Sequence, residues 1–217
     1  MKYFTFVTLL ILAFSTSYSQ VRLRGGMGVD YISDPSLYNY FNQNFATPGT
    51  QLGSFAASVN FSLEADYMVS DKYEVGLDVA YRIYSYNYAN ALGSYDLTYH
   101  NLMPTIVNYY VMNGSGYQFK FGGGIGIRFP NAKEALPSTT SSQTQTYTGI
   151  GFGLLLRASG NTQISSNLYA NILFDIRYDF NGALKNNGAN LYNRVDNSNV
   201  SFNSFSVGVG LGLTYYL

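Results

Sequence analysis

Strict alternation of apolar and polar residues, repeated in eight segments, constrains the fold of this chain more than any other feature. In residues 57–67, for example, every second residue is apolar, and the residues between them are Ser, Asn, Glu or Asp. A β-strand sends successive side chains to opposite faces, so this period of two predicts strands with a different environment on each face. The eight segments are 21–31, 55–67, 74–83, 95–111, 117–129, 149–157, 167–180 and 205–215.

The connections between these segments alternate in length. The short ones are 70–72, 112–116 and 159–165, and the long ones are 34–53, 85–94, 130–146 and 181–199. Such alternation predicts hairpins that run up and down, with all long connections at one end. We therefore expect an all-β protein, an eight-stranded antiparallel up-and-down barrel with four long external loops and three short periplasmic turns.

The apolar face of the predicted strands is expected to point outward into lipid. Charged residues make up 11% of the chain, against about 25% in a typical soluble domain, and none falls on the apolar face. That face carries bulky Phe, Leu, Ile and Tyr, whereas the opposite face is rich in Gly, Ser and Ala, which suits the crowded axis of a narrow barrel. A soluble, lipocalin-like barrel with its apolar face inside is the alternative architecture.

Aromatic residues on the apolar face sort by height into two groups, as the girdles of a transmembrane barrel do. The group predicted at the short-turn end is Tyr67, Tyr73, Tyr109, Tyr117 and Tyr215. The group predicted at the long-loop end is Tyr31, Phe55, Tyr81, Tyr99, Phe129, Tyr178 and Phe205.

The fourth segment breaks the pattern. Leu97 and Tyr99 share a phase with Val107, but Leu102 and Ile106 fall in the other phase. A bulge or bend near the proline at position 104 would reconcile the two halves, because proline cannot donate to a strand ladder.

The first 19 residues predict a secretory signal peptide, and residues 20–217 the barrel domain. Lys2 precedes an apolar run over residues 4–14, and Ser17 and Ser19 supply small residues for cleavage before Gln20. The apolar run is shorter than the roughly 20 residues that span a bilayer as a helix. The expected location is the outer membrane of a Gram-negative cell.

The whole predicted barrel resembles the small eight-stranded outer-membrane barrels of the OmpA/OmpX-like kind. The chain's last residues are similar to the terminal assembly signal of that family, and Gly212, Tyr215 and Leu217 match it. Leu217 stands where Phe is more common. The resemblance implies two partners, outer-membrane lipid and the barrel assembly machinery.

A balanced set of charges is predicted to face the interior of the barrel. These candidate residues are Arg22, Arg24, Asp30, Glu64, Asp66, Glu74, Asp78, Arg82, Lys120, Arg128, Arg157, Asp175, Arg177 and Asp179. Buried charges must be paired, so we expect a network that fills and neutralises the lumen, in which Arg24 pairs with Glu64 or Asp66 on the next strand. A narrow ion path or a proton-sensitive gate is the functional alternative.

Several chemistries find no support in the sequence. The chain has no Cys, which removes thiol catalysis and Cys-based metal sites. Its glycine-rich segments lack the strand–turn–helix context of a dinucleotide site. His100 is the single histidine, is predicted to point inward, and has no neighbouring Ser for hydrolysis. A formal charge of zero gives no electrostatic case for nucleic acid, whose binding needs clustered Lys and Arg. We predict no catalytic residue, no cofactor and no metal.

The long loops are the predicted place of function. Exposed aromatic and basic side chains on polar loops suit adhesion, ligand capture or docking to an extracellular ligand or surface partner. The candidate contacts are Tyr38, Tyr40, Phe41, Phe45, Tyr192 and Arg194. The alternative is that these residues fold over the barrel mouth. Our leading hypothesis is a non-enzymatic outer-membrane barrel with a structural or recognition role. The alternatives are a narrow channel or hydrophobic small-molecule passage, and a lipid-modifying enzyme.

Overall fold

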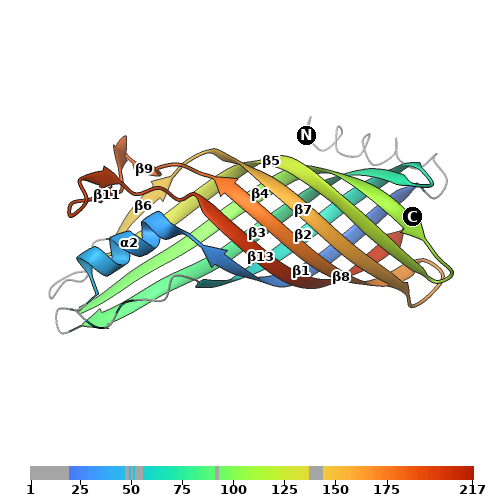
Figure 1. The fold of residues 1–217 in the computed structure, drawn as a ribbon, viewed down its shortest axis with the longest axis horizontal. Coiled ribbons are helices and arrows are strands. Elements are labelled where there is room, and N and C mark those ends of the chain that lie inside the picture. Colours follow the sequence, from blue (N-terminus) through green and yellow to red (C-terminus); the bar gives the residue numbers. More distant parts are fainter. Residues whose placement is uncertain (1–19, 47–48, 50, 52–55, 91–92, 137–143) are drawn as a thin grey trace, which may run out of the picture.

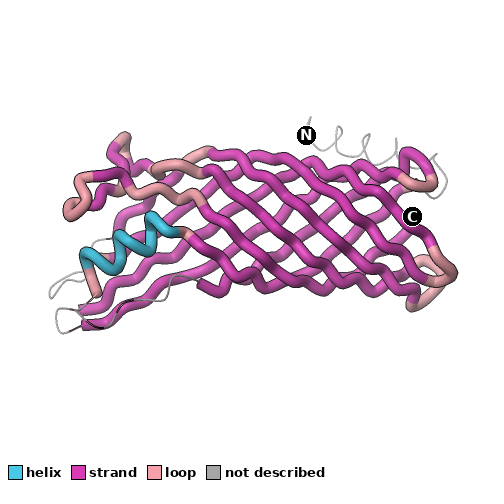
Figure 2. The backbone as a smooth tube through the Cα atoms, in the orientation of Figure 1, coloured by secondary structure: helices cyan, strands magenta, loops and turns pink. Residues whose placement is uncertain are grey.

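A computed structural model describes residues 20–46, 49, 51, 56–90, 93–136 and 144–217, and it confirms the predicted fold class. Eight strands close into one antiparallel barrel (Figures 1 and 2). They are β1 (Val21–Ser33), β2 (Ala56–Ser70), β3 (Tyr73–Asn90), β4 (Gly93–Asn113), β5 (Tyr117–Ala135), β7 (Gly151–Gln163), β8 (Leu168–Phe180) and β13 (Ser204–Tyr216). The predicted signal peptide and Phe55 lie outside the described residues.

Closure of the barrel pairs the first strand with the last. β1 pairs with β2 on one side and with β13 on the other, and β5 pairs directly with β7. Each of these eight strands is therefore hydrogen-bonded to a strand on both sides, as a wall that crosses hydrocarbon requires.

The three short turns and the ends of β1 and β13 lie at one end of the barrel, as predicted. Arg22 pairs with Tyr216 there, and the C-terminus is drawn at that end (Figure 1). The turn after β4 uses Gly116 at φ +79°, a left-handed conformation that glycine adopts without strain.

The opposite end is taller than predicted, because two of the expected loops are largely strand. β3 and β4 stay paired up to Asn90 and Gly93, and β5 runs to Ala135. Residues 85–90, 93–94, 130–135 and 144–146 were therefore wrongly predicted as loop, whereas residues 91–92 and 137–143 of the two predicted loops lie outside the described residues. The remaining elements at this end are α2 (Pro35–Asn44), β6 (Thr144–Thr148), β9 (Lys185–Asn186), β10 (Ala189–Asn190), β11 (Tyr192–Asn193) and β12 (Ser198–Asn199).

The outward face of the tall strands changes from apolar to polar along their length, and on β3 the inward face changes in the opposite sense. Low on β3, Val75 and Leu77 point outward, and the acidic residues on either side of them, Glu74 and Asp78, point inward. High on β4, Tyr95 and Leu97 point inward and are 1% and 0% exposed, while Thr98 points outward and is half-buried. Because the outward face becomes polar at the tall end, the alternation that predicts a strand with one apolar face does not extend to the upper parts of these strands.

The fourth strand contains no bulge, which corrects the prediction at Pro104. Its pairing with β3 is unbroken from Tyr73–Tyr110 to Asn90–Gly93, and Pro104 sits opposite Val79. All odd-numbered residues of β4 from 95 to 111 are buried, so Leu97, Tyr99, Val107, Tyr109 and Val111 face the interior. Leu102 and Ile106 face outward.

Glycines on β5 make room for the bulky interior of β4. A Cβ added at Gly122 would lie 2.5 Å from Tyr109 Cδ1, and one at Gly124 would lie 2.8 Å from Val107 Cγ1. Contacts this short are incompatible with close packing. The glycine face of β5 is thus complementary in size to β4.

Two aromatic girdles surround the outside of the barrel. Exposed rings near the short turns are Tyr67, Tyr73, Tyr117 and Tyr215, and those toward the tall end are Tyr31, Tyr81, Phe129, Tyr178 and Phe205. Tyr99 and Tyr109, which were also predicted in the girdles, point inside instead because β4 has the opposite phase.

Candidate functional site

All fourteen predicted lumenal charges lie buried inside the barrel, each at most 7% exposed. They comprise seven cations and seven carboxylates from six of the eight barrel strands; β4 and β13 contribute none. The alternation of the strands places them there, because each occupies the phase opposite to the outward-facing apolar residues.

The centre of the network joins three arginines to three carboxylates. Arg24 contacts Glu64 at 2.9 Å and Asp78 at 3.0 Å. Arg157 reaches both of these carboxylates and also contacts Asp175 at 2.7 Å. Arg177 contacts the same Asp175 at 2.8 Å. Glu64 was predicted as a partner of Arg24, and the structure adds Asp78.

A second group lies toward the short turns. Lys120 Nζ contacts Asp66 at 2.6 Å and Glu74 at 2.8 Å. Glu74 also forms an ion pair with Arg22. Asp66, the other carboxylate predicted for Arg24, is instead held by Lys120.

A third group lies toward the tall end and closes the lumen. Arg82 contacts Asp30 and Asp179, each at 3.0 Å, and Arg128 contacts Asp179 at 2.5 Å. Arg82, Arg128 and Asp179 have no solvent-exposed surface. A water-filled channel at this level would expose them, so the side chains fill the lumen here.

Above this group, an aromatic cap covers the barrel mouth. Asp34 begins helix α2 by accepting a hydrogen bond from the Leu37 N–H at 3.2 Å, and Pro35 follows at the first helical position. These are standard helix-start signals. Leu37 and Phe41 are fully buried. The buried core of the cap consists of Ile32, Leu37, Tyr40, Phe41, Tyr84, Tyr95, Leu97, Tyr99, Ala132, Tyr147, Leu184, Leu191, Val200 and Phe202.

One buried carboxylate connects the cap helix to the barrel strands. Glu134 on β5 is 1% exposed, and its Oε1 accepts hydrogen bonds of 2.7 Å from the hydroxyls of both Tyr40 and Tyr95. Burial and the nearby Glu134 raise the pKa of both phenols well above the usual value near 10. Burial also raises the pKa of the Asp34 carboxyl well above its ordinary value.

The six predicted loop contacts separate into two sets. Tyr40 and Phe41 are 6% and 0% exposed, and Tyr38 and Phe45 are half-buried. Assigning Tyr40 and Phe41 to an external contact surface was therefore wrong, because they pack inside the cap. Tyr192, 46% exposed, and Arg194 project from the hairpin of β11 and β12.

His100 points outward, contrary to the prediction. Its Nδ1 lies 2.9 Å from the Tyr81 hydroxyl, and the two rings stack with centroids 5.9 Å apart. Within the described part of the chain, no group of three or more His, Cys, Asp or Glu residues is arranged to hold a metal ion.

The matched residues of the terminal assembly signal lie on β13 and at the chain end. Gly212 packs closely against β1, whereas Tyr215 and Leu217 are exposed on the outer surface. Among the described residues, no helix is both long and apolar enough to cross a membrane.

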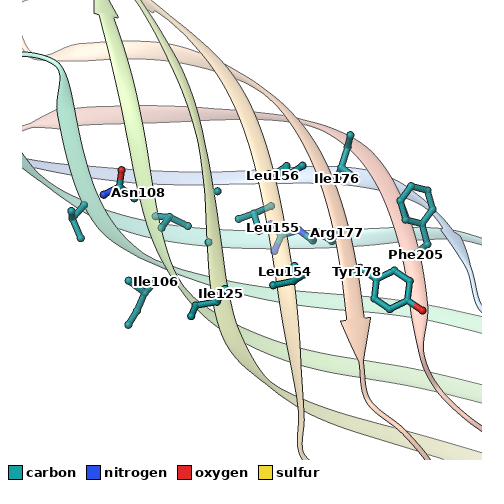
Figure 3. A pocket seen from close by; sticks show the side chains of 14 residues that line it. Ile106, Asn108, Ile125, Leu154, Leu155, Leu156, Ile176, Arg177, Tyr178 and Phe205 are labelled. Carbon is teal, nitrogen blue, oxygen red and sulfur yellow. The ribbon is translucent and has the colours of Figure 1, made fainter.

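A shallow groove of about 680 Å³ lies on the outer wall of the barrel (Figure 3). Gly123 leaves the gap, which Ile106, Ile125 and Leu154 border, and Asn108 lies beside it. Asn108 and Gly123 are direct cross-strand partners. The groove belongs to the apolar outer wall of the barrel.

Comparisons with known proteins find similarity in fold but not in sequence. No protein-family model matches the chain, and no curated protein is significantly similar to it. Neisserial surface protein A aligns at 15% identity over 91% of this chain and 97% of its own, with a TM-score of 0.48. Ail of Yersinia pestis aligns at 13% identity over 93% and 100%, with a TM-score of 0.49. OprG from Pseudomonas aeruginosa aligns at 16% identity over 92% and 96%, with a TM-score of 0.47. These identities are too low to transfer a ligand or an activity to this chain.

Proposed function

We propose that this protein is an integral outer-membrane barrel with a sealed lumen, and that it acts in recognition through its external cap. The observation that carries the membrane assignment is the closed wall whose exposed face is apolar. Leu63, Ile125 and Leu211 on that face are 65–70% exposed, whereas the charges lie inside. A soluble barrel with this surface would expose an apolar patch far beyond the few hundred Å² that monomers tolerate.

The filled interior argues against the channel alternative. Eight strands enclose just enough space for side chains, and here paired charges and the aromatic cap occupy it. Planar-bilayer recording tests this point: we expect no stepwise conductance from the purified protein, and reproducible single-channel steps would overturn the sealed lumen.

The hairpin of β11 and β12 supports the recognition role. It presents Tyr192, Arg194 and Val195 to solvent, with Val195 60% exposed. Its base is fixed, because Leu191 and Val200 on either side of it are buried in the cap core. Aromatic, aliphatic and cationic side chains on a fixed support are the composition of binding surfaces.

The absence of Cys from the sequence allows a direct test of location and topology. Val195→Cys places a single thiol on the hairpin, and Ser115→Cys places one in a short turn. On intact cells a membrane-impermeant maleimide should label the first variant, and should label the second only after the outer membrane is permeabilised. Labelling of both on intact cells, or release of the protein in the soluble periplasmic fraction, would overturn the proposal.

The recognition role has its own test. Cells that display the protein are compared with cells that display the double variant Tyr192→Ser, Arg194→Ser for adhesion to surfaces coated with extracellular-matrix protein. We expect lower adhesion by the variant at equal surface labelling. Equal adhesion would refute this role and leave the membrane assignment intact.

A further inference from the structure

A band of polar and basic side chains lies on the outer face of the tall strands. His100 on β4 pairs with Asn131 on β5, which pairs with Thr148 on β6, which pairs with Lys185 on β9. Direct cross-strand partners point to the same face of a sheet. These four side chains therefore form one row across four strands.

A second row lies one step higher on the same face. Lys133 on β5 pairs with Thr98 on β4 and with Thr146 on β6. Lys133 is exposed, while its neighbours Ala132 and Glu134 are 0% and 1% exposed and face the cap. We call these two rows the basic band.

The basic band begins directly above the outer aromatic girdle. The row below it contains Tyr81, Leu102 and Phe129, which pair across β3, β4 and β5 and are 38–42% exposed. The hydrogen bond and ring stacking between Tyr81 and His100 join the girdle to the band. Since aromatic girdles mark the boundary of the hydrocarbon, the band lies at the height of the lipid headgroups.

The band is positively charged and unbalanced. It contains two lysines and a histidine but no carboxylate, because the nearby Glu134 points into the cap. The nearest outward-facing acid on these strands is Asp96, which pairs with Ala135 one row above Lys133. The other cations on the external side face the lumen or, as Arg194 does, lie on the hairpin.

We infer that the basic band binds the phosphate of an outer-leaflet lipid headgroup, an inference that rests on the proposed membrane location. Lysine ammonium groups and threonine hydroxyls donate to phosphate oxygens. Strand spacing and rise place the Cα atoms of Lys133 and Lys185 about 12 Å apart, so their flexible stems can converge on one headgroup. The acyl chains of the same lipid would then lie against the girdle and the apolar wall below.

The test measures binding of lipid A that carries its phosphates to the folded protein purified in detergent, with native mass spectrometry as the readout. Lys133→Gln and Lys185→Gln are each expected to weaken binding about five-fold, and the pair about 25-fold. Lys72→Gln, in the short turn at the other end, is the matched control and should change nothing. Unchanged binding by the double variant, or an equal loss in the Lys72 variant, would overturn the inference.

Two further measurements distinguish a lipid headgroup from free phosphate as the ligand of the basic band. Lipid A without phosphates should bind weakly to wild type and respond to neither lysine. Inorganic phosphate at millimolar concentration should not displace the lipid; complete displacement would indicate a free-phosphate site and overturn the lipid assignment. Each sample is also run in gels with and without boiling: a wild type without a heat-dependent shift contradicts the membrane barrel itself, whereas a normal shift without a lysine effect contradicts only the headgroup site.

Discussion

Tyr40 in helix α2 donates a 2.7 Å hydrogen bond to Glu134 on β5, 94 positions later in the chain. This hydrogen bond connects α2, which follows β1, to the upper part of β5 at the tall end of the barrel. Because the acceptor is buried, its loss leaves a carboxylate with one phenol fewer to stabilise it. Glu134 is thus a buried polar anchor shared by α2 and β4 in the cap.

Replacing Tyr40 with Phe should loosen the cap while leaving the barrel closed. Hydrogen bonds to charged groups contribute about 1.5–3 kcal/mol, so amide exchange in residues 35–44 should accelerate by about ten-fold or more. Hydrogen exchange followed by mass spectrometry measures this effect. Tyr192→Phe, which alters an exposed phenol, is the control, and equal exchange in the two variants would contradict the role of the Tyr40 contact.

The cap should lose stability as the pH rises. The buried Asp34 carboxyl has a folded-state pKa above its unfolded value, so the folded cap binds the proton more tightly than the unfolded segment does. Its stabilising contribution is complete below the unfolded pKa near 4 and is lost as the pH rises through the folded pKa. Exchange of α2 amides, corrected for intrinsic rates, should show this trend.

Asp34→Asn should remove that trend and keep the helix, since Asn caps helices as well as Asp does. Asp196→Asn changes an exposed acid and should retain the trend. A pH dependence that survives in the Asp34 variant would show that another group is responsible.

The lumenal network should respond asymmetrically to removal of its members. Lys120→Met leaves Asp66 without its ion-pair partner, and breaking a buried pair in this way costs about 3–5 kcal/mol. Adding Asp66→Asn should recover part of the loss, because the orphaned charge disappears. Urea unfolding in lipid vesicles provides the free energies, and strictly additive losses would mean that the two side chains act independently.

The size match between β4 and β5 makes a prediction about packing. Gly124→Ala should destabilise the barrel by about 1–3 kcal/mol, because the new methyl group overlaps Val107. At Gly25 the nearest atom to an added Cβ is 3.5 Å away, so Gly25→Ala should be close to neutral. The two variants are compared by the temperature at which half of the folded band is lost from the gel. Equal midpoint temperatures would refute the size complementarity of β4 and β5.

The sequence predicts the barrel and the position of the lumenal charges because a period of two decides which residues share a face. It does not decide which face is outside when both are apolar. On β4, Leu102 and Ile106 lie on one face and Val107 and Tyr109 on the other, so either face could point outward. Packing against the neighbouring strand β5 decides which face points inward. The glycines of β5 that accept the bulky side chains, Gly122 and Gly124, can be seen in the sequence. Their position opposite Tyr109 and Val107 cannot be inferred without the register of the two strands.

The sequence analysis gave folding over the barrel mouth as the alternative for the loop residues, but it did not predict the strands and the helix that build the cap. On β3 the aromatic residues Tyr84 and Tyr86 lie on the face that is polar lower down, so a rule that expects one apolar face along the whole strand does not detect its upper part. The Asp34-Pro35 pair was a readable helix start, followed by Leu37, Tyr40 and Phe41 at helical spacing. Which long-range partner covers that apolar stripe is a property of the assembled barrel and of residues such as Phe202.

In the proposed membrane location, the change of the outward face of β3, β4 and β5 from apolar to polar would fix the immersion depth of the protein. Sliding the barrel inward by one residue pair would carry Lys133 and Lys185 toward hydrocarbon, where a lysine at the bilayer midplane costs about 2–4 kcal/mol and less near the surface. Sliding it outward would expose the girdle and the aliphatic wall to water. The residues along the strands therefore define the height at which the barrel sits in the bilayer. A bilayer that is too thick or too thin must deform around the barrel, because the barrel cannot move along the membrane normal without these costs.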